Sequence, residues 1–145
     1  MTSWSILLVD DSDTFRAPLR TALAAKGVRV IEAENGKQGL IRARTEHVDL
    51  IFSDVHMPVM DGLQMVRELR TLREYATTPI FVLTSDASGI RAAEGKSAGA
   101  TGWIVKPVHP DVLWKIAEKT LFGLPIRQTA IDSAASGEST RSGQK

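Results

Sequence analysis

Four short groups of polar residues, far apart in the chain, each follow directly after a run of apolar residues. These groups are Asp10-Asp11, Ser53-Asp54, Thr84-Ser85 and Lys106-Pro107. Together they contain carboxylates, hydroxyls and an ammonium group. A carboxylate can act as the nucleophile in phosphoryl transfer, while cations and hydroxyl donors can bind the phosphoryl oxygens. If folding brings the four groups together, they form a site suited to phosphoryl transfer.

The carboxylates of Asp10, Asp11 and Asp54 would repel one another at a shared site unless a proton or a cation relieved the repulsion. Mg²⁺ prefers oxygen ligands and often shares its coordination shell with phosphate oxygens. Lys106 supplies a compact positive charge for one phosphoryl oxygen, and the Thr84 hydroxyl can donate to another. The sequence contains no Gly-x-x-x-x-Gly-Lys-Ser/Thr loop, so we expect the phosphoryl group to come from a source other than a nucleotide bound by a P-loop.

The apolar runs that precede these groups belong to a regular alternation along the chain. Strands are expected over 5–9, 28–33, 49–53, 79–83 and 101–105, and helices over 13–26, 36–44, 63–73, 88–98 and 110–121. Continuous apolar runs are typical of strands that are buried on both faces of a parallel sheet. Five strand–helix units in a row therefore predict an α/β, doubly wound, flavodoxin-like parallel sheet of five strands, order 2-1-3-4-5.

The carboxyl ends of parallel strands lie along one edge, and ligands bind there where the strand order reverses. In this sheet the reversal lies between the first and third strands, so Asp10, Asp11 and Asp54 should share one crevice. Considered alone, the first two acids are better explained as capping residues of the first helix. Because Asp54 and Lys106 also stand at the carboxyl ends of strands, we interpret the two acids as part of a shared site.

Composition narrows the classes of function. The chain has 145 residues, a formal net charge of +1 and no cysteine, which excludes disulfides and thiolate metal sites. We expect one domain over 1–124 and a disordered tail over 125–145, where Ser, Thr and Gly are frequent. The balanced charge, the absence of an apolar run of roughly 20 residues and the lack of a signal-peptide pattern predict a cytoplasmic protein that binds neither nucleic acid nor membrane.

In their order and spacing, the polar groups resemble the signatures of response-regulator receiver domains of two-component systems. The resemblance rests on Leu8-Val9-Asp10-Asp11-Ser12, on Asp54-Val55-His56-Met57-Pro58 with Asp61-Gly62, on Thr84-Ser85 and on Lys106-Pro107, and it covers about residues 5–121. The run from Gly99 to Pro107 also resembles the single-domain CheY-type chemotaxis regulators.

The resemblance implies roles for the acids and their neighbour. Asp54 would be the phosphoacceptor. Asp11 would bind Mg²⁺ directly, Asp10 would act mainly through a bridging water, and the backbone carbonyl of His56 would complete the protein ligands of the metal.

The resemblance also implies roles for residues that do not bind the metal. Thr84 and Lys106 would bind phosphoryl oxygens, and Trp103 stands where the family carries its switch aromatic, usually tyrosine or phenylalanine. Trp103 is equally consistent with a half-buried packing anchor. His56 and Asp86 stand two residues after Asp54 and Thr84, at positions that tune the lifetime of the phosphoryl bond in the family.

The function implied is a stand-alone signalling switch rather than an enzyme, although it would assist its own Mg²⁺-dependent phosphorylation and dephosphorylation. A histidine kinase would donate the phosphoryl group. The fourth helix, fifth strand and fifth helix would then bind a partner such as a flagellar motor switch protein. Two alternatives stay open: a phosphate sink or phosphorelay intermediate without motor output, and an interaction module independent of phosphorylation, against which the intact polar groups argue.

Overall fold

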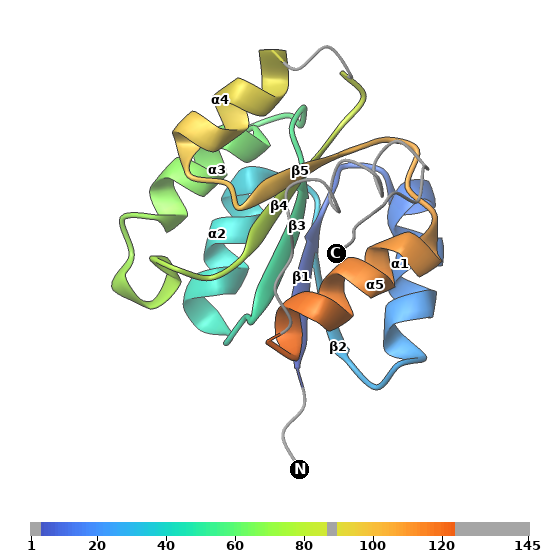
Figure 1. Ribbon diagram of the computed structural model, residues 1–145. Helices are drawn as coiled ribbons and strands as arrows, with labels where there is room; N and C mark the ends of the chain where they lie inside the picture. The colour runs from blue at the N-terminus through green and yellow to red at the C-terminus, as the bar shows by residue number, and fades with distance from the viewer. Residues whose placement is uncertain (1–3, 87–89, 124–145) are drawn as a thin grey trace.

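A computed structural model describes residues 4–86 and 90–123 of the chain, and they form one sheet with helices on both faces (Figure 1). The strands are β1 Ser5–Val9, β2 Arg29–Ala33, β3 Leu50–Asp54, β4 Ile80–Thr84 and β5 Gly102–Val105. All the pairings are parallel, and the order is β2-β1-β3-β4-β5. The predicted fold class and strand order are confirmed. The predicted tail over 125–145 lies outside the described residues.

The helices lie in two layers. They are α1 Asp13–Ala24, α2 Gly36–Thr45, α3 Gly62–Leu69, α4 Ile90–Ala98 and α5 Pro110–Leu121, with a short 3-10 helix, η1, at Arg73–Tyr75. In Figure 1, α1 and α5 cover one face of the sheet, while α2, α3 and α4 lie on the other side. Within the described residues, no helix combines the length and the apolar character that a membrane span requires.

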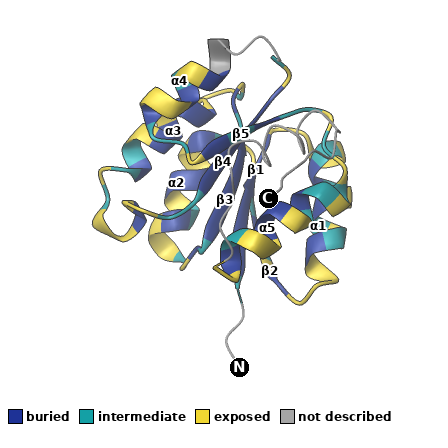
Figure 2. Ribbon diagram, viewed as in Figure 1, coloured by how far each residue is buried: buried dark blue, intermediate teal, exposed yellow. Residues whose placement is uncertain are grey.

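The interior strand β1 supplies side chains to two separate cores. Because successive side chains of a strand point to opposite faces, Ile6 and Leu8 pack with the α1–α5 layer, while Leu7 and Val9 pack with the α2–α3 layer. All four side chains are fully buried, and Figure 2 shows the strands buried between exposed helix surfaces. The strand ends are therefore held by packing on both faces of the sheet.

Helix α3 ends earlier than the sequence predicts. The apolar spacing predicts a helix over 63–73, but α3 stops at Leu69 and a 3-10 turn follows. The partly buried Arg70 side chain explains this correction: its guanidinium donates hydrogen bonds to the carbonyls of Tyr75 (2.7 Å), Thr78 (2.7 Å) and Gly99 (2.9 Å). The bonds to Tyr75 and Thr78 draw the chain that follows Arg70 back toward the end of α3, and the bond to Gly99 ties this end to the segment between α4 and β5.

The loop between β3 and α3 contains a strained residue. Val59 has a φ of +71°, and the residue is 76% exposed. A β-branched residue rarely adopts this left-handed region because its methyl groups crowd the backbone. On either side of it, the Met60 N–H donates to the Pro58 carbonyl at 2.7 Å, and the Met60 carbonyl accepts from the Gly36 N–H at 2.8 Å. These two bonds hold the turn in place.

We predict that Val59→Gly stabilises the fold. Glycine adopts this conformation without strain, and the relief should exceed the added freedom of the unfolded chain, giving a gain of about 1 kcal/mol in the free energy of unfolding. Urea denaturation followed by circular dichroism measures the change. The matched control Val59→Ala keeps a Cβ and should gain less. Equal or lower stability of the glycine variant would show that the turn is not strained.

Candidate active site at the carboxyl edge of the sheet

Residues from three strand ends meet at one point. Asp10 follows β1, Asp54 ends β3 and Lys106 follows β5. Asp10, Asp11 and Asp54 each offer a carboxylate oxygen within 4.8 Å of the others. The Lys106 Nζ lies 3.1 Å from Asp10 Oδ2 and 3.2 Å from Asp54 Oδ1. The structure thus brings together four of the residues that the sequence assigned to one site.

The three acids differ in how firmly they are held. Asp10 is 1% exposed, and its Oδ1 accepts a hydrogen bond from the Ser12 N–H at 2.9 Å. Asp54 has a 13% exposed side chain whose Oδ1 accepts from the Val55 N–H at 2.9 Å. Asp11 is exposed. Asp10 and Asp54 therefore form the buried, hydrogen-bonded side of the site, and Asp11 forms the side that faces solvent.

A buried arginine that the sequence analysis did not identify supports the Asp10 backbone. The Arg16 Nη1 donates to the Asp10 carbonyl at 2.5 Å, and its Nε donates to Glu32 Oε1 at 3.0 Å. One feature of the sequence could have indicated that Arg16 faces the core. Arg16 stands three residues before the buried Leu19, and residues with this spacing lie on the same face of a helix. Its guanidinium connects α1 and β2 to the end of β1.

The environment of Asp54 disfavours its charged form. Burial raises the pKa of the Asp54 carboxyl, and the negative charge of Asp10 raises it further, although the Lys106 ammonium and the Val55 N–H oppose the shift. A carboxylate loses hydration on burial and repels a like charge nearby. An ionised Asp54 therefore favours the approach of a cation.

We predict that Asp54→Asn stabilises the metal-free protein at neutral pH. The carboxyl has a raised pKa in the folded state, so folding binds its proton more tightly and stability falls as the pH rises above the ordinary value of 3.8. Asparagine never ionises and avoids this loss. Urea denaturation in a chelator at several pH values measures the difference, which should vanish in acid. The exposed Asp111→Asn is the control. No gain at neutral pH would contradict the shift.

Thr84 and Asp86 form a turn beside the cluster. Thr84 ends β4, is buried and accepts a hydrogen bond on Oγ1 from the Asp86 N–H at 3.0 Å. Its carbonyl accepts from the Lys106 N–H at 2.7 Å. The Thr84 backbone therefore lies directly beside that of Lys106.

His56, on the β3–α3 loop, has an exposed side chain.

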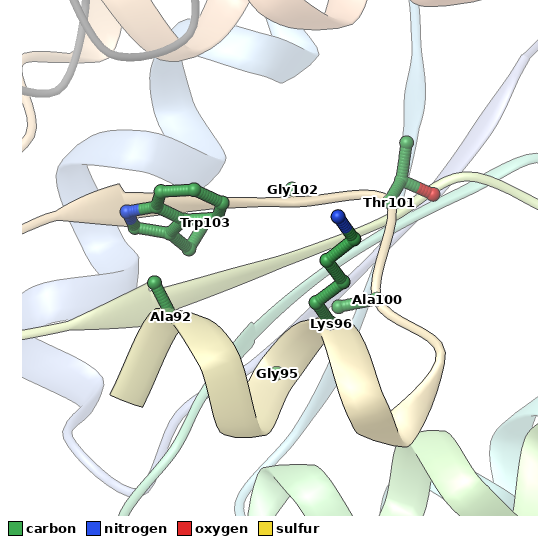
Figure 3. A pocket seen from close by; sticks show the side chains of 7 residues that line it. All are labelled: Ala92, Gly95, Lys96, Ala100, Thr101, Gly102 and Trp103. Atoms are coloured by element: carbon green, nitrogen blue, oxygen red, sulfur yellow. The ribbon is translucent and has the colours of Figure 1, made fainter. Parts of the chain in front are cut away.

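Trp103 lies on β5 opposite Val82, three residues before Lys106, and packs against the α2–α3 core. Its indole borders a pocket of about 110 Å³ between α4 and β5 (Figure 3). The lining residues are mostly small: Ala92, Gly95, Lys96, Ala100, Thr101, Gly102 and Trp103. Small side chains leave room beside the ring, so this face can accept a repacked indole or a partner side chain.

Comparison with known proteins agrees with this geometry. Residues 6–118 match the response regulator receiver domain family. Protein PilH of Pseudomonas aeruginosa is 35% identical over 118 residues, which cover 81% of this chain and 98% of that protein. The chemotaxis response regulator CheY4 of Vibrio cholerae has a similar structure, with a TM-score of 0.78 and 39% identity over 82% of this chain and 99% of that one.

A third similar structure bears on the acids. The receiver domain of the sensor histidine kinase PA1611 from Pseudomonas aeruginosa, described with a magnesium ion coordinated in its active site cleft, has a TM-score of 0.77 and 27% identity, covering 83% of this chain and 99% of that chain. The family match spans β1 through most of α5 and includes all the strand ends that carry the acids and the lysine. The chain therefore belongs to the response regulator receiver domain family.

Proposed function

We propose that this protein is a phosphorylation-activated response regulator, which accepts a phosphoryl group from a histidine kinase onto Asp54 and then changes its binding to a partner protein. The observation that carries the proposal is the position of the Lys106 ammonium, 3.1 Å from Asp10 and 3.2 Å from Asp54. It places a cation beside a largely buried carboxylate at a strand end. The oxygens of an incoming phosphoryl group also need a cation at this place.

The chemistry follows from the residues present. A carboxylate oxygen of Asp54 attacks the phosphorus of the kinase phosphohistidine; a new P–O bond forms and the P–N bond to the imidazole breaks. The Lys106 ammonium then pairs with a phosphoryl oxygen. The Thr84 hydroxyl, which now accepts from the Asp86 N–H, donates to another oxygen when its side chain turns toward the site.

The acid cluster fits Mg²⁺. All its donors are carboxylate oxygens, they lie within 4.8 Å of one another, and Asp11 is open to solvent, which suits an ion that retains several waters. Asp10, Asp11, Asp54 and the backbone carbonyl of His56 would hold the ion. Bound there, it supplies positive charge that offsets the acids and the phosphoryl oxygens.

We predict weak Mg²⁺ binding, in the submillimolar to millimolar range, that depends on Asp11. Titration calorimetry on the wild-type protein should show binding, and Asp11→Asn should weaken it by about tenfold or more because a direct ligand loses its charge. Asp13→Asn removes an acid two residues away that lies outside the cluster, and it should bind as the wild type does. A wild-type protein that binds no Mg²⁺ would remove the proposed metal from this site.

The output surface proposed is the face formed by α4, β5 and α5. The Thr84 carbonyl is bonded to the Lys106 N–H, and Trp103 lies on the same strand beside the α4 pocket. Movement of Thr84 toward the phosphoryl group would therefore alter the space around β5 and shift the indole. The similarity to CheY4 favours a chemotaxis partner, such as a flagellar motor switch protein, as the target of this face.

We predict that beryllofluoride, a stable mimic of the aspartyl phosphate, shifts the amide signals of α4 and β5 and the indole signal of Trp103. Nuclear magnetic resonance spectra with Mg²⁺ alone and with Mg²⁺ plus beryllofluoride measure this. Thr84→Ala should bind the mimic but show much smaller shifts, because the hydroxyl link is missing. Binding without these shifts in the wild type would favour the alternative function, a phosphate sink or relay. Equal shifts in Thr84→Ala would exclude Thr84 as the link.

A further inference from the structure

We propose that Phe15 is a positioning residue, whose ring holds the Lys106 ammonium in place for the phosphoryl group. The Lys106 Nζ lies 4.2 Å from the centre of the Phe15 ring. A cation within about 6 Å of a ring centre is attracted by the negative face of the aromatic system. The inference deepens the proposed function and rests on it.

The ring belongs to a closed chain of contacts around the site. Asp10 Oδ1 accepts from the Ser12 N–H at 2.9 Å, and the Ser12 hydroxyl accepts from the Phe15 N–H at 3.1 Å. The Phe15 ring meets Lys106, whose ammonium donates to Asp10 Oδ2 at 3.1 Å. The N-terminal cap of α1 therefore fixes the backbone of Phe15 relative to the same carboxylate that pairs with the lysine.

The partners of the ammonium respond differently to phosphorylation. Asp10 and Asp54 attract Lys106 through their charges. Mg²⁺ would offset part of this attraction, and phosphoryl transfer would replace the Asp54 carboxylate by charged phosphoryl oxygens, so the ionic partners of the ammonium change during the reaction. The ring of Phe15 is neutral and is not consumed. Because the ring takes no part in the bonds that form and break, its contact with the ammonium can persist through the transfer. The flexible four-carbon stem of lysine would otherwise allow the ammonium to move into solvent.

Packing of the ring is a separate contribution. Phe15 is partly buried and packs against the α1–α5 core, so removal of the ring could also disturb α1. Fluorination separates packing from attraction to the cation. Each added fluorine lowers the negative electrostatic potential on the face of the ring and changes the shape of the ring little. A graded response to fluorination identifies attraction to the cation, which apolar packing alone does not produce.

The test uses the full chain with 4-fluoro-, 3,5-difluoro- and 3,4,5-trifluorophenylalanine at position 15, together with Phe15→Leu and Phe15→Tyr. Intact-mass time courses with acetyl phosphate and Mg²⁺ give the rate of phosphorylation. We expect a stepwise fall across the fluorinated series, a loss of about two- to five-fold in Phe15→Leu and a rate near wild type in Phe15→Tyr. The Lys106 ε-methylene protons should show an upfield ring-current shift that disappears in Phe15→Leu.

Three results would overturn the inference on different grounds. Equal rates across the fluorinated series, with a phosphorylated wild type, would show that the ring acts by packing alone and would leave the proposed function intact. A wild type that acetyl phosphate does not modify would refute the proposed function and this inference with it. An absent ring-current shift in the wild type would refute the Phe15–Lys106 contact directly, without any phosphodonor.

Discussion

The ion pairs of Lys106 compensate a constraint that the fold itself creates. A parallel sheet puts all its carboxyl ends on one edge, and here that edge brings Asp10, Asp11 and Asp54 within reach of one another. The strands cannot move apart to relieve the repulsion, because apolar cores pack against both faces of the sheet. Positive charge must therefore come to the acids, and the ammonium at the end of β5 supplies it.

This dependence connects the site with a distant surface. Lys106 is joined through its backbone to Thr84, and the strand that it follows carries Trp103 on the wall of the α4 pocket. Arg70 links the same region to α3, because it donates to the Gly99 carbonyl between α4 and β5. A change in the partners of the Lys106 ammonium would therefore act on β5, and other residues of β5 line the surface beside α4. This connection is the physical basis of the proposed switch.

The sequence predicted those parts of the fold and of the candidate site that depend on local patterns. Apolar runs followed by polar pairs located the strand ends, so the meeting of Asp10, Asp54 and Lys106 followed once the strand order was inferred. The parts it could not predict depend on contacts between distant residues. Arg70 ends α3 by binding carbonyls up to 29 residues away, and the ring of Phe15 meets a lysine that follows β5. No periodicity marks such contacts.

The central claim is that Asp54 is the carboxylate that becomes phosphorylated. The most direct measurement treats the wild-type protein with acetyl phosphate and Mg²⁺, reduces the product with borohydride and maps the peptides by mass spectrometry. Borohydride converts an aspartyl phosphate into homoserine and leaves free carboxylates unchanged. The account predicts homoserine at position 54 alone. Homoserine at position 10, 11 or 61 instead, or none at any position, would contradict it.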